Sequence, residues 1–394
     1  SIQFCRLFYR RFVEDKNITL FSPHEVQDLY GWFGYDNDKF EELYEQYERS
    51  RSIYKKQIKA RDFFNAFCQE RIGTGRMYIM NIDHCNDHSS FNDKIKMSNL
   101  CQEITLPTTP IGHIDDGDDV GSEIALCVLS AINVGAVKLD ELPDVCMNIA
   151  RSLDSVIEHQ YYPVSASRKM LKRRSIGVGV TNLAYYLAKH GVKYDDKEAC
   201  NIVDELMEHI QFYMIKASIQ LAREKGQCEW FDRTKYSKGV LPIDTYSKAV
   251  DKIVTRKLKL PWEKLRKDIK KYGMRNSTLT ALMPCESSSL VTNSTNGIEP
   301  PRGLLSIKKS KQGLIPQVVP EIYTLRTKYT LAYEMENNNG YTNIVAVMQK
   351  YIDQAISANH YYNFSRYESG NLPMSEVARD ILYAYKMGNT PLEY

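Results

Sequence analysis

Segments with a helical spacing of apolar residues alternate along this chain with short apolar runs of strand length, and this alternation limits the fold more than any other feature. The clearest helical stripe is formed by Leu142, Val145, Ile149, Leu153 and Val156. The same spacing predicts further helices over about 197–225, 342–355 and 374–387.

Between these helical segments lie apolar runs of a length typical of strands. They cover residues 103–107, 123–134, 175–180, 278–284 and 303–308. Strands that are continuous apolar runs suit a sheet that is covered on both of its faces. We therefore predict an α/β fold.

The composition excludes several classes of protein. With 43% hydrophobic and 26% charged residues among 394, the chain is typical of a globular protein, and it has no apolar run long enough to cross a membrane. A formal charge of +3 provides no basic field for nucleic acid. We expect a small-molecule ligand, and neither a membrane nor a nucleic acid as partner.

The cysteines indicate a cellular compartment, and the first residues indicate whether the sequence is a piece of a longer protein. Nine cysteines are scattered without the spacing of a disulfide scaffold, which favours a reducing, cytoplasmic location. The stretch "DHCNDH" (83–88) lacks a second cluster to complete a zinc site, so we predict no metal. The chain begins with serine, without an initiator methionine or a signal peptide, which is typical of a piece of a longer reading frame.

Two charged stretches and one glycine pair have ordinary structural explanations. The acidic stretch "HIDDGDDVGSE" (113–123) and the basic stretch "SRKMLKRR" (167–174) are most simply solvated surface. The glycines of "GVGV" (177–180) match part of a dinucleotide-binding fingerprint, but Asn182 stands where its third glycine is needed. We therefore predict no Rossmann site.

A lone thiol between an amide and a carboxylate is the first candidate for chemistry. Cys101 has Asn99 two residues before it and Glu103 two residues after it. In an extended or loop segment these three side chains point to the same side, so they can face one ligand, with Glu103 as a general base. The alternative is that Cys101 is a small buried apolar residue.

Two further segments are candidates for the same site. Cys127 lies on a run that the sequence predicts to be a buried strand. It can act as half of a dithiol only if it comes close to Cys101. The segment 282–303 follows a strand with Ser287, Ser288 and Ser289, and such a turn can present backbone amides and hydroxyls to a phosphate. An ordinary serine-rich helix cap explains the same residues.

Seven motifs along the chain together resemble one family. They are "NITLFSPHEV" (17–26), "GRMYIMNIDHCNDHS" (75–89), "SNLCQEITLPTTP" (98–110), "SEIALCVLSA" (122–131), "NLAYYLAKHG" (182–191), "RNSTLTALMPCESSS" (275–289) and "TNGIEPPRG" (295–303). That family is the large, catalytic subunit of class Ia ribonucleotide reductase. The resemblance runs in unbroken order from about residue 6 to residue 390.

The resemblance implies the C-terminal half of a ten-stranded α/β barrel, with a catalytic finger loop at about 85–135 and a second half-barrel at about 135–394. An N-terminal ATP-cone domain and the first half-barrel, to which nucleotide effectors bind, have no counterpart in this sequence. The resemblance also implies that no cofactor is bound in this chain. A small subunit with a di-iron tyrosyl radical supplies the radical, and thioredoxin or glutaredoxin is the reductant.

The resemblance assigns roles to individual residues. Cys101 becomes a thiyl radical that removes the 3′ hydrogen of the ribose, Glu103 takes the 3′-hydroxyl proton, and Asn99 binds the sugar hydroxyls. Cys127 is one of the two thiols that reduce the 2′ position. The substrate phosphates bind at Pro284, Cys285, Glu286, Ser287, Ser288 and Ser289.

This sequence departs from the family pattern at two places. The partner thiol of Cys127 belongs to the first half-barrel in the family. Near the end of the barrel the family has two consecutive tyrosines that relay the radical, and here Glu393 and Tyr394 stand at the matching positions. We include Tyr394 among the predicted catalytic residues, whereas a glutamate cannot form a relay radical.

We predict that the chain takes part in the reduction of ribonucleoside diphosphates, in an oligomer with an N-terminal half and the small subunit, and that alone it is inactive. One alternative is another thiyl-radical reductase that uses adenosylcobalamin or a glycyl radical. The other is a non-catalytic fragment that binds nucleotides or the small subunit.

Overall fold

A computed structural model describes residues 1–112, 121–310 and 313–392. Its helices are α1 (Arg6–Val13), α2 (Gln27–Trp32), α3 (Asn37–Arg49), α4 (Ala60–Thr74), α5 (Ile82–His88), α6 (Leu142–His159), α7 (Met170–Arg173), α8 (Leu183–Lys189), α9 (Lys197–Lys225), α10 (Pro242–Thr245), α11 (Trp262–Tyr272), α12 (Glu286–Val291), α13 (Ile322–Leu325), α14 (Asn339–Gln349) and α15 (Met374–Met387). Its strands are β1 (Ile2–Phe4), β2 (Asn17–Phe21), β3 (Lys55–Lys59), β4 (Ile79–Asn81), β5 (Val128–Asn133), β6 (Ile176–Thr181), β7 (Leu305–Ser310), β8 (Gly313–Val318) and β9 (Pro391–Leu392).

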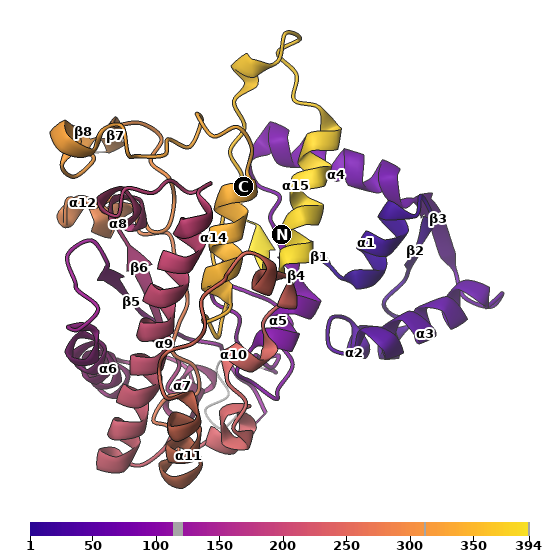
Figure 1. The fold of residues 1–394 in the computed structure, drawn as a ribbon. Coiled ribbons are helices and arrows are strands. Elements are labelled where there is room, and N and C mark those ends of the chain that lie inside the picture. The colour runs from indigo at the N-terminus through magenta and orange to yellow at the C-terminus, as the bar shows by residue number, and fades with distance from the viewer. Residues whose placement is uncertain (113–120, 311–312, 393–394) are drawn as a thin grey trace.

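The predicted α/β class is confirmed, and the elements form a large body with a smaller N-terminal lobe. In Figure 1 the lobe, made of α1–α4 and the antiparallel ribbon β2–β3, lies to the right of the body, next to α15. In the body, the long helix α9 packs against α6, α11 and α14. Among the described residues, no helix has both the length and the apolar character needed to cross a membrane.

A parallel array of strands forms the centre of the body. β5 pairs with β6 along its whole length. The next segment, 278–282, bridges to β6 between Thr280 and Val178, and residues 354–357 bridge to it between Ile356 and Leu282, both in parallel. All six residues of β6 are buried, as its continuous apolar sequence predicts. β5 falls inside the segment predicted as a finger loop, but its pairing places it with the strands.

Three of the predicted strands differ from the structure. Residues 103–107 are almost entirely buried but form no strand ladder, because their segment joins the array through one hydrogen bond, from Ala355 N to Glu103 O (3.0 Å). Residues 278–284 contribute isolated bridges only. The run 303–308 becomes β7, which pairs with β8 in an exposed antiparallel hairpin rather than in a covered sheet.

The predicted helices are confirmed, with one shortened. α9 and α15 have the predicted bounds, and α6 begins at Leu142. α14 ends at Gln349 rather than at 355. The chain leaves the helix because the carboxylate of Asp353 accepts hydrogen bonds from the backbone amides of Leu279 (2.9 Å) and Thr280 (2.8 Å) in the neighbouring strand segment.

A second, small sheet joins segments that are far apart in the sequence. β4 pairs in parallel with β1 and antiparallel with β9. The side chain of Asn81 strengthens this junction by donating to the carbonyl of Asn389 (2.8 Å), 308 positions further along the chain. The described residues at the two ends of the chain therefore lie in one sheet, on either side of β4.

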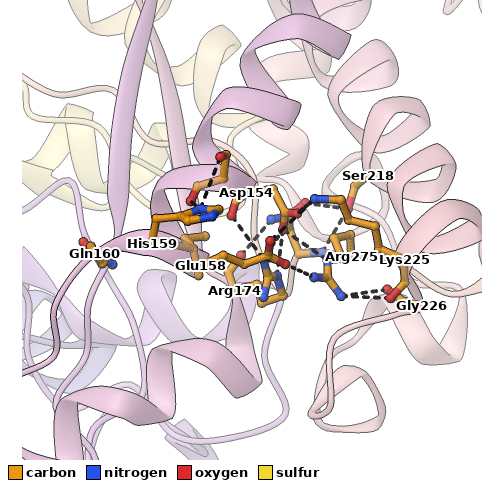
Figure 2. Close-up of polar contacts among 12 residues, drawn as sticks. Asp154, Glu158, His159, Gln160, Arg174, Ser218, Lys225, Gly226 and Arg275 are labelled. Atoms are coloured by element: carbon orange, nitrogen blue, oxygen red, sulfur yellow. Dashed lines mark hydrogen bonds and ion pairs between the residues drawn. The ribbon is translucent and has the colours of Figure 1, made fainter.

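A buried ion-pair network fixes the beginnings of β6 and of the segment 278–282 (Figure 2). Asp154 of α6 is 0% exposed and accepts hydrogen bonds from Arg174 Nε (2.7 Å), Arg275 Nε (3.1 Å) and Lys225 Nζ (3.1 Å). Glu158, one turn later, accepts from the same two arginines. The network thus connects α6 and the end of α9 to two strands.

The prediction that the basic stretch 167–174 is solvated surface is wrong for its last two residues, because they form buried ion pairs. Arg173 and Arg174 are both buried. Arg173 forms ion pairs with Glu123 and Asp93, so the last residue of the acidic stretch 113–123 is buried as well. Residues 113–120 of that stretch lie outside the described part of the chain.

The glycines of "GVGV" allow two strands to approach closely. A side chain on Gly179 would place its Cβ 2.8 Å from the backbone carbonyl oxygen of Ala281, a group that cannot turn aside. The pair is therefore explained by packing within the array.

We predict that Gly179→Ala lowers the free energy of unfolding by about 1–3 kcal/mol, the usual cost of overpacking a core. A denaturant titration measures this effect. Gly31→Ala is the matched control, because a Cβ at Gly31 meets nothing within 4 Å. Equal stability of the two variants would contradict the packing explanation.

Candidate active site

The segment 99–104 forms a tight turn that presents Cys101. Asn99 closes the turn from both sides, since its backbone amide donates to Ile104 O (3.3 Å) and its Oδ1 accepts from Ile104 N (3.0 Å). Gln102 has a positive φ of 63° inside the turn. Leu100 is 78% exposed at the tip, and Cys101 is half-buried beside it. The thiol therefore lies on a turn, which is the loop form of the extended or loop segment that the sequence suggested.

Glu103 follows the turn and is buried, with 3% of its surface exposed. Burial raises the pKa of its carboxyl group, and a hydrogen bond with the side chain of Asn99 partly opposes this shift. Its Oε2 has no hydrogen-bond partner among the described residues. The turn thus brings Asn99 and Glu103 together and leaves one carboxylate oxygen available to a ligand.

Cys127 lies immediately before β5, beside the strand array. Gln354 Nε2 donates to its Sγ at 3.6 Å. Burial raises the pKa of this thiol to about 12, and the nearby charges of Asp353 and Glu103 contribute to the shift. Ala355, the residue after Gln354, donates its amide to Glu103 O (3.0 Å), so Cys127 and Glu103 both lie against the segment 354–357. In the structure Cys101 and Cys127 are not joined by a disulfide.

Cys285 marks the other side of the site, where the segment 278–284 ends and α12 begins. Its backbone amide donates to Asn296 Oδ1 (2.9 Å), and its thiol lies 3.8 Å from Val180 O. Burial raises the pKa of this thiol to about 11, and the charge of Glu103 makes a smaller contribution to this rise.

The predicted phosphate-binding residues lie at the beginning of α12. Pro284, Glu286, Ser287 and Ser288 are exposed. Ser288 and the buried Ser289 donate their hydroxyls to carbonyls of their own turn, at 3.2 and 3.1 Å. The backbone amides of a first helical turn have no partner within the helix, so they are the donors left for an anion.

A cavity of about 240 Å³ adjoins α12. Its walls come from the first turn of α12, the loop 294–303 and the β7–β8 hairpin, and they include Glu286, Ser289, Arg302 and Lys308. Lys308 reaches across from β7 and pairs with Glu286 at 3.1 Å. The cavity therefore carries both cationic and polar groups next to the predicted phosphate site.

The remaining predictions concern the C-terminal residues and the histidine-rich stretch on α5. Glu393 and Tyr394 lie outside the described residues. The histidine-rich stretch on α5 serves structure, since the ring of His88 contacts Thr245 Oγ1 (2.9 Å) and Gln349 O (2.6 Å). Over the described ranges, no group of three His, Cys, Asp or Glu side chains is arranged to hold a metal ion.

Two residues of the site, Asp353 and Gln354, were not predicted from the sequence. The spacing predicts a helix over 342–355, which hides the turn that brings them to the strand array. An acidic residue followed by an amide in a buried apolar segment is the signal that could have singled them out, because buried polar groups need specific partners.

Comparison with known proteins identifies the family of the chain. The family model described as "Ribonucleotide reductase, barrel domain" matches residues 1–394. The chain belongs to the ribonucleotide reductase barrel-domain family. Among its relatives is the ribonucleoside-diphosphate reductase subunit alpha of Haemophilus influenzae, 50% identical over 399 residues that cover 100% of this chain and 52% of the relative.

Two further relatives of this barrel domain have the same extent. The ribonucleoside-diphosphate reductase 1 subunit alpha of Escherichia coli K12 is 50% identical, over 100% of this chain and 52% of the relative. The subunit alpha of Enterobacteria phage T4 is 43% identical, over 98% of this chain and 52% of the relative. The chain thus spans about half the length of the curated relatives it matches.

Proposed function

We propose that this barrel domain carries the reducing site of a ribonucleoside-diphosphate reductase, which converts ribonucleoside diphosphates to 2′-deoxyribonucleoside diphosphates by a thiyl-radical mechanism. The observation that carries the proposal is the position of Glu103. Its carboxyl group follows the turn that presents Cys101, and its backbone carbonyl accepts from Ala355, the neighbour of the residue Gln354 that contacts Cys127.

In the proposed reaction, the Cys101 thiyl radical takes the 3′ hydrogen of the ribose and returns a hydrogen at the end. Glu103 accepts the 3′-hydroxyl proton, which its free Oε2 and its contact with Asn99 support. The 2′ hydroxyl leaves as water, while Cys127 and a second thiol lose two hydrogen atoms and become a disulfide. The second thiol comes from the remaining half of the large subunit.

The substrate diphosphate is proposed to bind at the start of α12. The free amides of its first turn attract the negative charge of a phosphate, as at other helix N-termini. The residues concerned are Pro284, Cys285, Glu286, Ser287, Ser288 and Ser289. Because the hydroxyls of Ser288 and Ser289 already donate to the helix, the backbone contributes more to this binding than the side chains do.

The barrel architecture is part of the same proposal. We infer a ten-stranded barrel of two five-stranded halves. Its finger loop, predicted at about 85–135, carries Cys101 and ends before β5. The parallel array of β5, β6, 278–282 and 354–357 supports one half, and the hydrogen bond from Ala355 to Glu103 supports a loop that enters it.

The proposed partners follow from the reaction. A small subunit with a di-iron tyrosyl radical generates the radical at Cys101, and thioredoxin or glutaredoxin reduces the disulfide. Nucleotide effectors bind the remaining half of the large subunit, and the whole forms an oligomer. Tyr394 is proposed as the last relay residue before Cys101.

The proposal is tested by combining this chain with the remaining half of a large subunit and a small subunit, and by measuring the conversion of CDP to dCDP. We expect turnover in the presence of a dithiol reductant, and none from this chain alone. A stable complex that binds CDP but forms no dCDP would instead favour the non-catalytic alternative.

The raised pKa of Glu103 predicts the pH dependence of the reaction. A base acts in its ionised form, so kcat/KM should rise with pH through a value above the ordinary carboxyl pKa of about 4.3. Glu103→Gln should lower kcat by about 10²–10⁴-fold and remove this rise. Glu103→Asp, the matched control, should keep the rise at a reduced rate. If kcat/KM of Glu103→Gln still rose with pH in the same range, the rise would belong to another group.

A further inference from the structure

The thiol of Cys127 is enclosed by three segments of the strand array. Gly177 of β6 leaves room for it, because a Cβ on this glycine would come within 3.0 Å of Cys127 Sγ. Gln354 donates to the sulfur from the segment 354–357. Two acidic groups act on it as well, Glu103 from the turn segment and Asp353 from the residue before Gln354.

The orientation of the Gln354 amide is fixed by a second contact. Its Nε2 lies 3.1 Å from the backbone carbonyl oxygen of Ile176, which can only accept a hydrogen bond. The amide nitrogen, not the oxygen, must therefore face this side. One of its two hydrogens is directed to Ile176 and the other to the sulfur of Cys127.

The backbone around Gln354 is held rigidly. Its own amide donates to Thr280 O (3.2 Å), and its carbonyl accepts from Gln349 Nε2 (3.1 Å). Asp353, directly before it, accepts from two strand amides and from the Tyr236 hydroxyl (2.7 Å). Gln354 is 2% exposed, so water does not compete for its hydrogen bonds.

We propose that Gln354 is a positioning residue for the redox chemistry of Cys127, whose sulfur it holds against the array and stabilises as the thiolate. This inference rests on the proposed function, in which Cys127 ends each turnover in a disulfide. Neither Glu103 nor Asp353 can supply this stabilisation, because both carry negative charge when ionised.

The role of Gln354 falls in the step that restores the thiols. A thiolate of the dithiol reductant attacks the partner sulfur of the Cys127 disulfide, the S–S bond breaks, and its electron pair leaves on Cys127 Sγ. The reductant sulfur becomes bonded to the partner sulfur, and Cys127 then takes up a proton. A hydrogen-bond donor on the leaving sulfur lowers its basicity and speeds its departure.

The inference is tested by measuring the alkylation rate of Cys127 with iodoacetamide as a function of pH, resolved from the other cysteines by peptide mass spectrometry. Only the thiolate reacts. In Gln354→Met we expect the apparent pKa of Cys127 to rise by about one unit. The rate below that pKa should fall about threefold, because the higher intrinsic reactivity of a more basic thiolate offsets part of the tenfold loss of thiolate.

Three controls separate this role from general loosening of the site. Asn86→Leu removes another buried amide, which donates to the backbone carbonyls of Ile82 and Ile95 rather than to the thiol or to the Gln354 segment, and it should leave the Cys127 profile unchanged. Gln354→Glu should raise the pKa at least as much as Gln354→Met. Cys101, measured in the same samples, should keep its own profile.

An unchanged Cys127 profile in Gln354→Met would overturn the inference, and so would an equal shift in Asn86→Leu. Because the assay follows a thiol and not turnover, it is independent of the proposed function. A shifted profile in a chain that never supports dCDP formation would retain the local role of Gln354 and reject the reductase proposal. Normal turnover with an unshifted Cys127 profile would retain the reductase proposal and reject the role of Gln354.

Discussion

Replacing Cys101 with serine should lower dCDP formation in the assembled enzyme by about 10⁴-fold or more, the scale of loss seen when a residue that makes bonds in the reaction is removed. A serine hydroxyl holds its hydrogen too strongly to become the radical that attacks the ribose. The measurement is product formation from CDP, with chromatographic separation of the two nucleotides.

The fold should tolerate this change, which makes the result specific to chemistry. Cys101 is half-buried on a turn whose neighbour Leu100 points into solvent, so the unfolding curve should stay close to that of the unmodified chain. Cys5→Ser is the matched control. Cys5 caps the start of α1, a position that serine favours, and activity should be retained. Substantial turnover by Cys101→Ser would exclude Cys101 as the hydrogen carrier.

The largest effect on stability is expected from Asp154→Ala. The substitution removes the carboxylate that Arg174, Arg275 and Lys225 share in a buried setting (Figure 2). Breaking a buried ion pair by removing one partner costs about 3–5 kcal/mol, because the remaining charges lose their compensation. Denaturant titration at neutral pH measures the loss as a lower midpoint with an unchanged slope.

Glu224→Ala is the control for Asp154→Ala. Glu224 pairs with Arg151 at the surface through two hydrogen bonds of 2.6 and 2.7 Å, and its removal should leave the midpoint close to that of the unmodified chain. If Asp154→Ala and Glu224→Ala lowered the denaturation midpoint equally, burial would not explain the contribution of the Asp154 network to stability.

The network also predicts how stability depends on pH. Burial by itself would raise the pKa of Asp154, but the hydrogen bond and charge of Arg174 outweigh it and lower the pKa below its ordinary value. The contribution is therefore complete above the unfolded-state pKa of about 3.9, and it is lost as the pH falls through the lowered folded-state value. Asp154→Ala should flatten this acid-side decline.

The sequence predicted the helices more reliably than the strands. The apolar stripes of α9 and α15 are long and end in glycine, so local spacing determines their bounds. Residues 103–107 have the composition of a strand, but their neighbours in space leave most of their backbone without a pairing strand. Arg173 and Arg174 resemble surface charges in the sequence, and only the distant partners Glu123 and Asp154 explain their burial.

For the site, motif order singled out Cys101, Glu103, Cys127 and the start of α12, and the structure adds the turn and the buried position of Glu103. It could not be predicted from the sequence that Ser288 and Ser289 direct their hydroxyls to their own helix, or that Gln354 contacts a thiol 227 positions away. Such contacts depend on tertiary packing rather than on spacing.

The sheet in which β4 lies between β1 and β9 has a consequence for the order in which the protein is made. On a ribosome, β1 and β4 emerge long before β9, the strand that completes their sheet. Until β9 is made, one edge of β4 stays unpaired, and closing so long a loop is slow. Completion of this sheet therefore reports that synthesis has passed residue 392, which gives the cell a structural difference between a chain that contains β9 and a shorter nascent one.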